Sequence, residues 1–382
     1  MKKSLIAVAV ASAFVAPAAM AEVTISGAIN VGIQYGKSNA GSTPGATSLN
    51  TNQLHAHYSH MDIESVDDIG GGNKVIFHYQ FDISGTSSAQ VPLAGGAVGN
   101  RNSFLGVAGG WGAFKMGTNE NVYERFMYTA DPLDGAAGAG GNLNILGTPG
   151  AGRVFEVGQG GCAAAGCADF YRRSEQTIWY ESPNFSGFTF EVDYTLSAFK
   201  TSGPGATDPK ILSIGGKFQP EGGPFYVDLA YESHKDMFGT VALGGPAGGS
   251  SKDTAMQVGG GLMLGDLGLH LRYERLKYKT APDEYKRDAV WFGLKYNLPS
   301  GYIGAELGVA ADGKLNGAKQ ADTGARMFAV GYYHNLSKQS QLQFVYGRTD
   351  NKDNATYAQI GAPGAAPGSD HQVFEVNLKH TF

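Results

Sequence analysis

Apolar and polar side chains alternate strictly along segment after segment of this chain. In the final stretch, VFEVNLKHTF, Phe374 and Val376 lie on one side of an extended chain, and Glu375 and Asn377 lie on the other. Successive side chains of a β-strand point to opposite faces, so this stretch predicts a strand with one apolar and one polar face. Because an unpaired strand of this kind promotes aggregation, the fold has to satisfy its hydrogen-bonding edges.

The same period-two pattern recurs in 16 segments, most of them longer than an average strand. The segments are residues 23–35, 54–66, 73–84, 100–108, 111–118, 171–182, 187–199, 209–219, 224–234, 253–264, 267–279, 286–297, 301–311, 325–336, 340–350 and 371–382. Short turns alternate with longer, polar, Gly-rich loops. The longer loops are expected at 37–53, 85–99, 119–170, 235–252 and 350–370. This order predicts an up-and-down antiparallel meander.

The composition and the polar faces together favour a barrel in a membrane. Gly at 57 of 382 residues and aromatic residues at 11% suit a chain of many turns and tyrosine-rich strands. The polar faces carry charged residues in strand after strand, so we expect the apolar faces to point into lipid. A closed barrel is the only sheet that satisfies its backbone in hydrocarbon, and sixteen strands leave an aqueous interior. We therefore predict an all-β fold, a 16-stranded antiparallel transmembrane β-barrel, over residues 22–382.

The segment before this barrel, MKKSLIAVAVASAFVAPAAMA (residues 1–21), has the pattern of a secretory signal peptide. Lys2 and Lys3 precede an apolar stretch, Pro17 interrupts it, and small residues precede Glu22. The apolar stretch is shorter than the ~20 residues of a spanning helix, which disfavours an uncleaved anchor. Removing the two lysines lowers the formal net charge from −5 to −7. A chain this acidic is not expected to bind nucleic acid.

Two cysteines, Cys162 and Cys167, lie close together in GGCAAAGCADF. In the oxidising compartment to which a signal peptide directs the chain, a local disulfide between them is expected. A metal site is the weaker alternative, because no histidine or further cysteine lies at ligand spacing. We expect neither a metal nor a cofactor.

Phrases spread over nearly the whole chain resemble the trimeric general-diffusion porins of Gram-negative bacteria, in particular the β-proteobacterial type. In order, they are VTISGAINVGIQY, ESVDDIGGGNKVIFHYQFD, RNSFLGVAGGWGAFKMG, YRRSEQTIWYESPNFSGFTFEVDY, HNLSKQSQLQFVYG and NLKHTF. The resemblance implies a homotrimer in the outer-membrane lipid, through which small hydrophilic solutes and ions diffuse passively. It implies that a long third loop, beginning at TNENVYERFMY, folds into the lumen and narrows it. It also implies that the terminal Phe382 is a recognition signal for the outer-membrane barrel assembly machinery.

The resemblance further indicates which charged residues line the pore constriction. Asp131 of TADPLDG matches an acidic loop position, and its neighbours Asp134 and Glu120 share the role. Arg101 of RNSFLGV and Arg173 of RRSEQTIWY match arginines of the facing wall. Opposed charges across a narrow aqueous gap set ion selectivity. Two alternatives stay open: the arginines as lumen residues that only join neighbouring strands, and the aspartates as turn residues.

The chain departs from the family where SHMDIES replaces the phrase S-R-x-G-F-x-G. This change places His60 at an arginine position of the constriction, with Asp62 and Glu64 following on the same face as lumen-wall residues. Because histidine titrates near pH 6.5, His60 predicts conductance or selectivity that depends on pH between 5 and 8. His55 and His57 do not converge with it from one strand, which favours polar wall residues over a metal site. The lost arginine and the acidic chain favour a weak preference for cations, although relatives are often anion-selective.

Three other functions compete with passive diffusion. An enzyme is disfavoured because the chain has no G-x-S-x-G phrase and no recognisable pairing of serine and histidine. An adhesin or structural barrel would lack an open lumen. A substrate-specific channel is the closest alternative, and saturable uptake of one solute class would distinguish it from size-limited diffusion.

Overall fold

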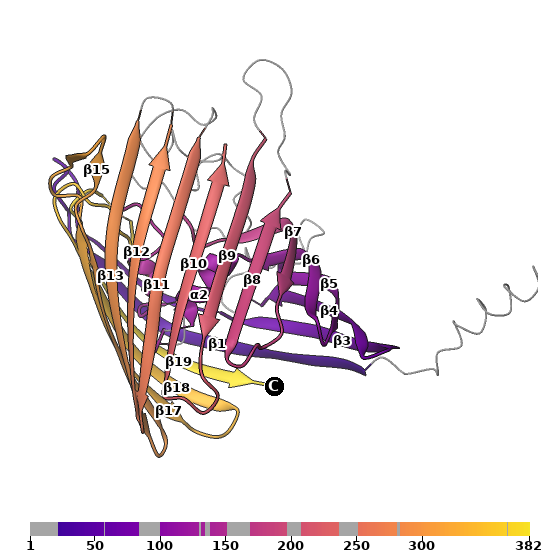
Figure 1. The fold of residues 1–382 in the computed structure, drawn as a ribbon. Coiled ribbons are helices and arrows are strands. Elements are labelled where there is room, and N and C mark those ends of the chain that lie inside the picture. Colours follow the sequence, from indigo (N-terminus) through magenta and orange to yellow (C-terminus); the bar gives the residue numbers. More distant parts are fainter. Residues whose placement is uncertain are drawn as a thin grey trace, which may run out of the picture.

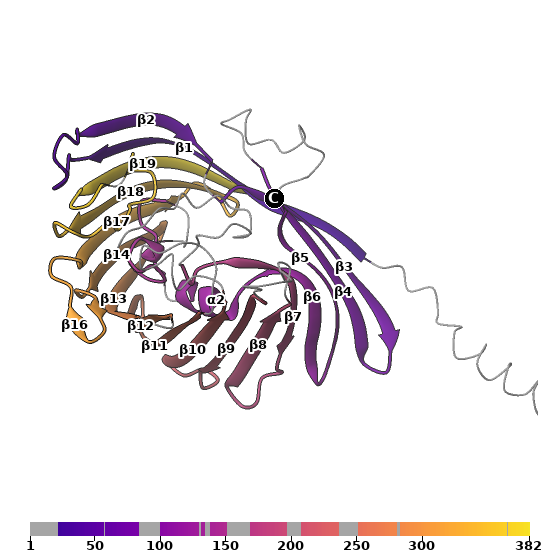
Figure 2. The same cartoon turned by 90° about the horizontal axis from the view of Figure 1, so that it is seen from above.

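The computed structural model describes residues 22–56, 58–83, 100–129, 131–133, 138–150, 169–196, 208–236, 251–280, 283–364 and 366–382. Figures 1 and 2 show these residues as a ring of tilted strands around a central space that contains a short helix. The predicted signal peptide, Asp134, Cys162 and Cys167 lie outside the described residues. The expected cleavage and disulfide therefore remain predictions.

Among the described residues, nineteen strands form a single sheet in which neighbouring strands pair in the antiparallel sense. They are β1 (Glu22–Ser38), β2 (Leu49–His55), β3 (His60–Gly70), β4 (Asn73–Asp82), β5 (Asn100–Gly109), β6 (Gly112–Glu120), β7 (Arg173–Glu181), β8 (Phe188–Thr195), β9 (Lys210–Phe218), β10 (Phe225–Lys235), β11 (Lys252–Leu264), β12 (Leu267–Lys279), β13 (Glu284–Leu298), β14 (Gly301–Ala310), β15 (Lys314–Leu315), β16 (Ala318–Lys319), β17 (Ala325–Asn335), β18 (Ser340–Asn351) and β19 (His371–Thr381).

These strands make a closed wall of sixteen, which confirms the predicted fold class. The two short strands β15 and β16 form a hairpin beyond the wall, and β14 pairs directly with β17. Strands β2 and β3 pair one after the other with the same strand, β1, so they count as one interrupted strand of the wall. The wall closes where β1 pairs with β19, with Tyr35 opposite Phe374. This pairing leaves no open edge on the terminal strand.

One predicted loop is wrong in part. Residues 37–53 were expected to be a loop, but β1 continues to Ser38 and β2 begins at Leu49. The sequence of β2, LNTNQLH, lacks the alternation of apolar and polar residues because most of its outward side chains are amides rather than hydrocarbon. The expected strand at 54–66 is interrupted between His55 and His60, where Tyr58 has a positive φ of 56°.

The two faces of the wall have the expected character. On β12, for example, Arg272 and Glu274 point inward and are buried, whereas Leu271 points outward and is 58% exposed. Large apolar side chains are exposed on the outward face of most strands. The described chain therefore buries charge inside and presents hydrocarbon outside, as a transmembrane barrel requires. No helix among the described residues is long and apolar enough to cross a bilayer.

The described part of the long loop after β6 lies inside the barrel (Figure 2). It contains the helix α2 (Val122–Tyr128) and the 3₁₀ turn η3 (Asn142–Asn144). Val122 and Phe126 approach the inner face of β9 at Gly215, where an added Cβ would lie 2.7 Å from Val122. The wall thus needs a glycine at this position for the helix to pack closely.

Candidate functional site

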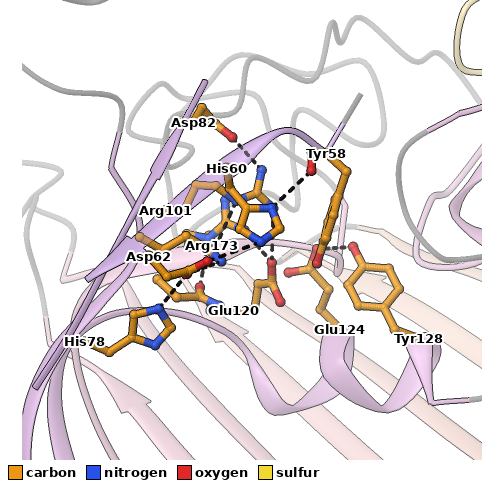
Figure 3. Close-up of polar contacts among 12 residues, drawn as sticks. Tyr58, His60, Asp62, His78, Asp82, Arg101, Glu120, Glu124, Tyr128 and Arg173 are labelled. Carbon is orange, nitrogen blue, oxygen red and sulfur yellow. Dashed lines mark hydrogen bonds and ion pairs between the residues drawn. The ribbon is translucent and has the colours of Figure 1, made fainter. Parts of the chain in front are cut away.

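A cluster of charged side chains on the inner face of β3 to β7 faces the loop (Figure 3). Its centre is Arg101 on β5, which is 2% exposed. Arg101 donates through Nη1 to Asp82 Oδ1 at 2.7 Å and through Nε to Gln80 Oε1 at 3.1 Å. Its guanidinium also lies over the Tyr58 ring, 4.7 Å from the centroid. These contacts hold the cation in one position on the wall.

Glu120 is the carboxylate that joins the two predicted arginines. Its Oε1 accepts a hydrogen bond from Nη2 of Arg173 and lies 3.8 Å from Nη2 of Arg101. Asn102 supports the arrangement, because its Oδ1 accepts from Nε of Arg173 at 2.9 Å and from the backbone N–H of Glu120 at 3.0 Å. The structure therefore brings Arg101, Arg173 and Glu120 together, as the sequence indicated.

The first helical turn of the loop adds a further acid beside this group. The hydroxyl of Tyr128 donates to Glu124 Oε1 at 2.6 Å. Burial, and then the nearby charge of Glu120, raise the pKa of Glu124 to about 7. Glu124 is thus a loop carboxyl whose pKa lies near neutral pH, and no pattern in the sequence indicated it.

The histidine of the sequence prediction belongs to a second part of the cluster. His60 Nε2 lies 3.3 Å from Asp62 Oδ2, and its Nδ1 lies 3.0 Å from the carbonyl oxygen of Tyr58. His78 on β4 contacts the same aspartate, with Nε2 2.8 Å from Asp62 Oδ1, and its Nδ1 lies 3.6 Å from Glu64 Oε1. His78 was not predicted as a site residue, although its alternation with Gln80 and Asp82 along β4 already placed it on the polar face.

Asp131 lies elsewhere in the lumen. Its carboxylate accepts from the backbone N–H groups of Leu133 at 2.8 Å and Asn142 at 3.2 Å, within the loop itself. It lies beside Glu306 of β14, on the wall away from β5 and β7. These contacts agree with the alternative interpretation of Asp131 as a turn residue. The loop carboxylate that contacts the two arginines is Glu120 instead.

Charged residues on the opposite wall anchor the loop. Glu274 on β12 accepts from the hydroxyl of Tyr123 at 2.8 Å, from the N–H of Gly147 and from Nη1 of Arg287 at 2.8 Å. The start of α2 is capped by the wall as well. Asp193 Oδ2 accepts from the N–H of Val122 at 2.7 Å, which supplies the partner that an N-terminal turn needs.

The loop between β18 and β19 packs on the third loop from the extracellular side. Thr356 donates its N–H to the carbonyl of Gly150 at 2.8 Å, and Ile360 donates its N–H to Asn144 Oδ1 at 2.8 Å. Gly150 has a φ of 62°, and an added Cβ would lie 1.9 Å from the Tyr357 ring. Two loops, rather than one, therefore fill this part of the lumen.

Free space remains between the third loop and the strands near the barrel seam. It is lined by Tyr58 and Leu133 together with Tyr333, Gln343, Asn377 and Lys379. Most of the exposed lining is polar. Among the described residues, no group of three or more His, Cys, Asp or Glu side chains is arranged to hold a metal ion.

Comparison with known proteins gives concordant matches. A family model described as Gram-negative porin matches residues 7–354. The chain is 27% identical to the outer membrane porin protein 32 of Delftia acidovorans over the full length of both chains. The fold matches an anion-selective porin from Comamonas acidovorans with a TM-score of 0.74 at 20% identity, covering 95% of this chain and 100% of the other. It also matches the trimer form of OmpT from Vibrio cholerae with a TM-score of 0.59 at 14% identity, covering 95% and 99%.

Proposed function

The chain belongs to the Gram-negative porins, channels of the outer membrane for passive diffusion, and from this premise we propose that the charged cluster of Figure 3 is the constriction of its pore. The constriction would comprise Arg101, Arg173, Glu120 and His60, with Asp62 and Glu64 on the adjoining wall. The observation that supports this most directly is that Glu120, at the start of the third loop, contacts both arginines. Asp131 and Asp134 would contribute only through the general charge of the loop.

The cluster makes the pore selective by local electrostatics. Arg101 and Arg173 are the fixed cations, and they lie among the carboxylates of Asp82, Glu120 and Asp62. Above neutral pH, where Glu124 is ionised, the carboxylates outnumber the two arginines. We therefore propose a weak preference for cations, in contrast to the anion-selective porin from Comamonas acidovorans.

The reversal potential of a planar bilayer under a salt gradient tests the sign directly. At pH 8 the purified protein should give a potential of cationic sign. A clearly anionic potential at pH 8 would contradict the proposed ion preference, but it would not contradict the function as a channel.

Liposome swelling with sugars of increasing size tests the diffusion mechanism. Rates that fall with solute size and stay linear with concentration support passive diffusion, whereas saturation by one solute supports the substrate-specific alternative.

We propose a homotrimer as the working assembly, because the chain belongs to the porin family and resembles the trimer form of OmpT from Vibrio cholerae. Light scattering of the protein in detergent tests this assembly, and a mass equal to that of a single chain would contradict it.

Phe382 is proposed as the signal that the barrel assembly machinery recognises. Its backbone exchanges two hydrogen bonds with Gly27, each of 3.1 Å, and its ring is 43% exposed on the outward face.

A further inference from the structure

Four neutral amide side chains line the lumen on either side of the barrel seam. Asn30 lies on β1, Gln341 and Gln343 lie on β18, and Asn377 lies on β19. Gln343 is the direct register partner of Asn377, and Lys379 is the direct partner of both Gln341 and Asn30. The amides alternate with outward apolar residues and therefore point into the barrel. We call these four residues the amide wall.

The amides of β1 and β18 form a chain of hydrogen bonds that runs in one direction. Asn30 Nδ2 donates to Gln343 Oε1 at 3.4 Å, and Gln343 Nε2 donates to Gln341 Oε1 at 2.9 Å. Gln341 Nε2 donates in turn to Asn335 Oδ1 at 2.9 Å. At the head of this chain, Asn30 Oδ1 is buried and has no donor among the described residues. Because hydrogen bonds in such a chain polarise one another, this oxygen is a strengthened acceptor.

A second acceptor of this kind lies on the neighbouring strand β19. Asn377 donates through Nδ2 to Glu375 Oε2 at 3.4 Å, but its Oδ1 has no donor in the part of the chain that the structure describes. Gly32 leaves room for this side chain, since an added Cβ there would lie 1.9 Å from Asn377 Oδ1. A buried acceptor without a donor costs free energy, so the amide wall is stabilised when the contents of the pore supply O–H groups.

The amide wall borders the free space beside the third loop. Asn30, Gln343 and Asn377 line this space together with Tyr58. The ring of Tyr58 also lies against Arg101 of the charged cluster. A solute that passes the proposed constriction therefore comes within reach of the amides.

Two charged groups at the same space disfavour ions of either sign. Glu375 is 1% exposed, and its Oε1 accepts from Gln34 Nε2 at 2.5 Å and from the N–H of Ala139 at 3.0 Å. This carboxylate is engaged by the wall and the loop, so it is not open to the ammonium group of a solute. Lys379 lines the same space. The carboxylate repels anions and the lysine repels cations, whereas a neutral solute meets neither repulsion.

We propose that the amide wall is a binding subsite for neutral, hydroxyl-rich solutes, the class to which simple sugars belong. The inference rests on the proposed function as a channel and adds the solute class that the pore retains. Hydroxyl groups of the solute donate to Asn30 Oδ1 and Asn377 Oδ1. Transport stays passive, because the subsite holds a solute that still diffuses in either direction, and it slows diffusion only at concentrations near its half-saturation.

Ion current through the purified protein in a planar bilayer tests the proposal, because a bound solute obstructs the current. The probes are glucose, glucuronate as the anionic analogue, glucosamine as the cationic analogue, and triethylene glycol dimethyl ether, which accepts hydrogen bonds but cannot donate them. Glucose should reduce the current with a saturable component. The ether should lower the current only in proportion to the conductivity of the bulk solution, and both charged sugars should need higher concentrations than glucose.

Two variants and a matched control locate the subsite. Asn30→Leu and Asn377→Leu keep the approximate size of the side chain and remove its acceptor, so each should raise the half-saturating glucose concentration about fivefold, as expected for one hydrogen bond between neutral groups. Gln53 is the direct register partner of Gln34 and donates to it on the same inner face, but it is not among the described residues that line the free space. Gln53→Leu should leave the half-saturating concentration unchanged.

Three results would overturn the subsite: no saturable component with glucose, equal obstruction by the ether, or tighter binding of either charged sugar. An unchanged half-saturating concentration in both Asn30→Leu and Asn377→Leu would also reject it. If these variants fail to fold, deoxyglucoses and the unmodified protein decide the matter, since removal of single hydroxyl groups should weaken the obstruction and equal obstruction would reject the hydrogen bonds. Normal ion conduction without saturation would reject the subsite alone, whereas a protein that forms no conducting pore would reject the proposed function.

Discussion

Glu120 on β6 and Arg173 on β7 are direct register partners across the lumen wall, and the guanidinium of Arg173 donates to the Glu120 carboxylate. The pair lies where β6 ends and the third loop begins, and Glu120 is two residues before the start of α2 at Val122. The carboxylate of Glu120 is thereby held at the end of a wall strand and at the start of the loop at once. The charge balance around this pair is accessible to experiment.

Glu120→Gln should shift the channel toward anions. The substitution removes a carboxylate that contacts both Arg101 and Arg173. A unit charge at 4 Å in water is worth about 1 kcal/mol, so the permeability ratio of anion to cation should rise roughly fivefold. Reversal potentials under a salt gradient measure the change. Glu221→Gln, in an exposed turn outside the lumen, is the control, and equal shifts in both variants would contradict the assignment.

Selectivity should move toward anions between pH 8 and pH 5. As the pH falls, Glu124 takes up a proton through its raised pKa of about 7, which removes one negative charge from the cluster. His60, which the sequence predicts to make selectivity depend on pH, lies beside Asp62 in the same cluster. His60→Ala should reduce the shift, while His334→Gln on the outward face should not. Identical reversal potentials at pH 5 and pH 8, for the unmodified protein and for His60→Ala, would remove the role of His60.

The packing of α2 should weaken as the pH rises through 7. Glu124 holds its proton more tightly in the folded protein than in the unfolded chain, so the folded state loses stability relative to the unfolded one as the pH rises from about 4.5 toward 7. Hydrogen exchange of the α2 amides should therefore be faster at pH 8 than at pH 6, after correction for the intrinsic rate. Glu124→Gln should abolish this difference. Persistence of the difference in that variant would assign it to another group.

Glu274→Gln should loosen the third loop without opening the barrel. The change leaves Arg287 buried without its carboxylate and weakens the bonds to Tyr123 and Gly147. Breaking a buried ion pair by removing one partner costs about 3–5 kcal/mol. Single-channel conductance should become larger and noisier. Asp288→Asn breaks an exposed ion pair with Arg275 on the outer face and serves as the control, which should conduct normally.

Gly150→Ala should displace the loop between β18 and β19. The new methyl group would overlap the Tyr357 ring, and a left-handed φ costs a residue other than glycine about 1–2 kcal/mol. Adding Tyr357→Ala relieves the overlap but not the backbone cost. The double variant should therefore recover part of the normal conductance, and a double variant no better than Gly150→Ala would show that the ring contact is unimportant.

Deletion of Phe382 should impair assembly in cells. The deletion removes two backbone hydrogen bonds to Gly27 and the outward aromatic ring, but it leaves the pairing of β1 and β19 intact. The yield of folded protein in the outer membrane should fall, while refolding in detergent should succeed. A normal yield in cells would count against the assembly signal.

The wall of this protein was predictable because lipid outside and water inside impose opposite demands on alternate residues. That constraint acts on every strand, so segments such as 267–279 and 371–382 were located within a few residues. Arg101 and Arg173 were predicted as wall residues from the resemblance to the porin family, and both lie in the charged cluster of Figure 3. Partners across the lumen follow no period in the sequence, which is why Glu274, His78 and the inward packing of Tyr357 were missed. Asp131 was assigned to the constriction from the resemblance to the porin family. Its contacts depend on the local turn of the loop, which the alternation of apolar and polar residues does not predict.

The interruption between β2 and β3 has a consequence for the width of the channel. It allows Tyr58 to leave the plane of the wall and to lie against Arg101 at the level of the charged cluster. Tyr58 is thus carried by the wall and not by the third loop. In the proposed constriction, movement of the loop would therefore leave Tyr58 in place, and the opening would widen from the loop side only.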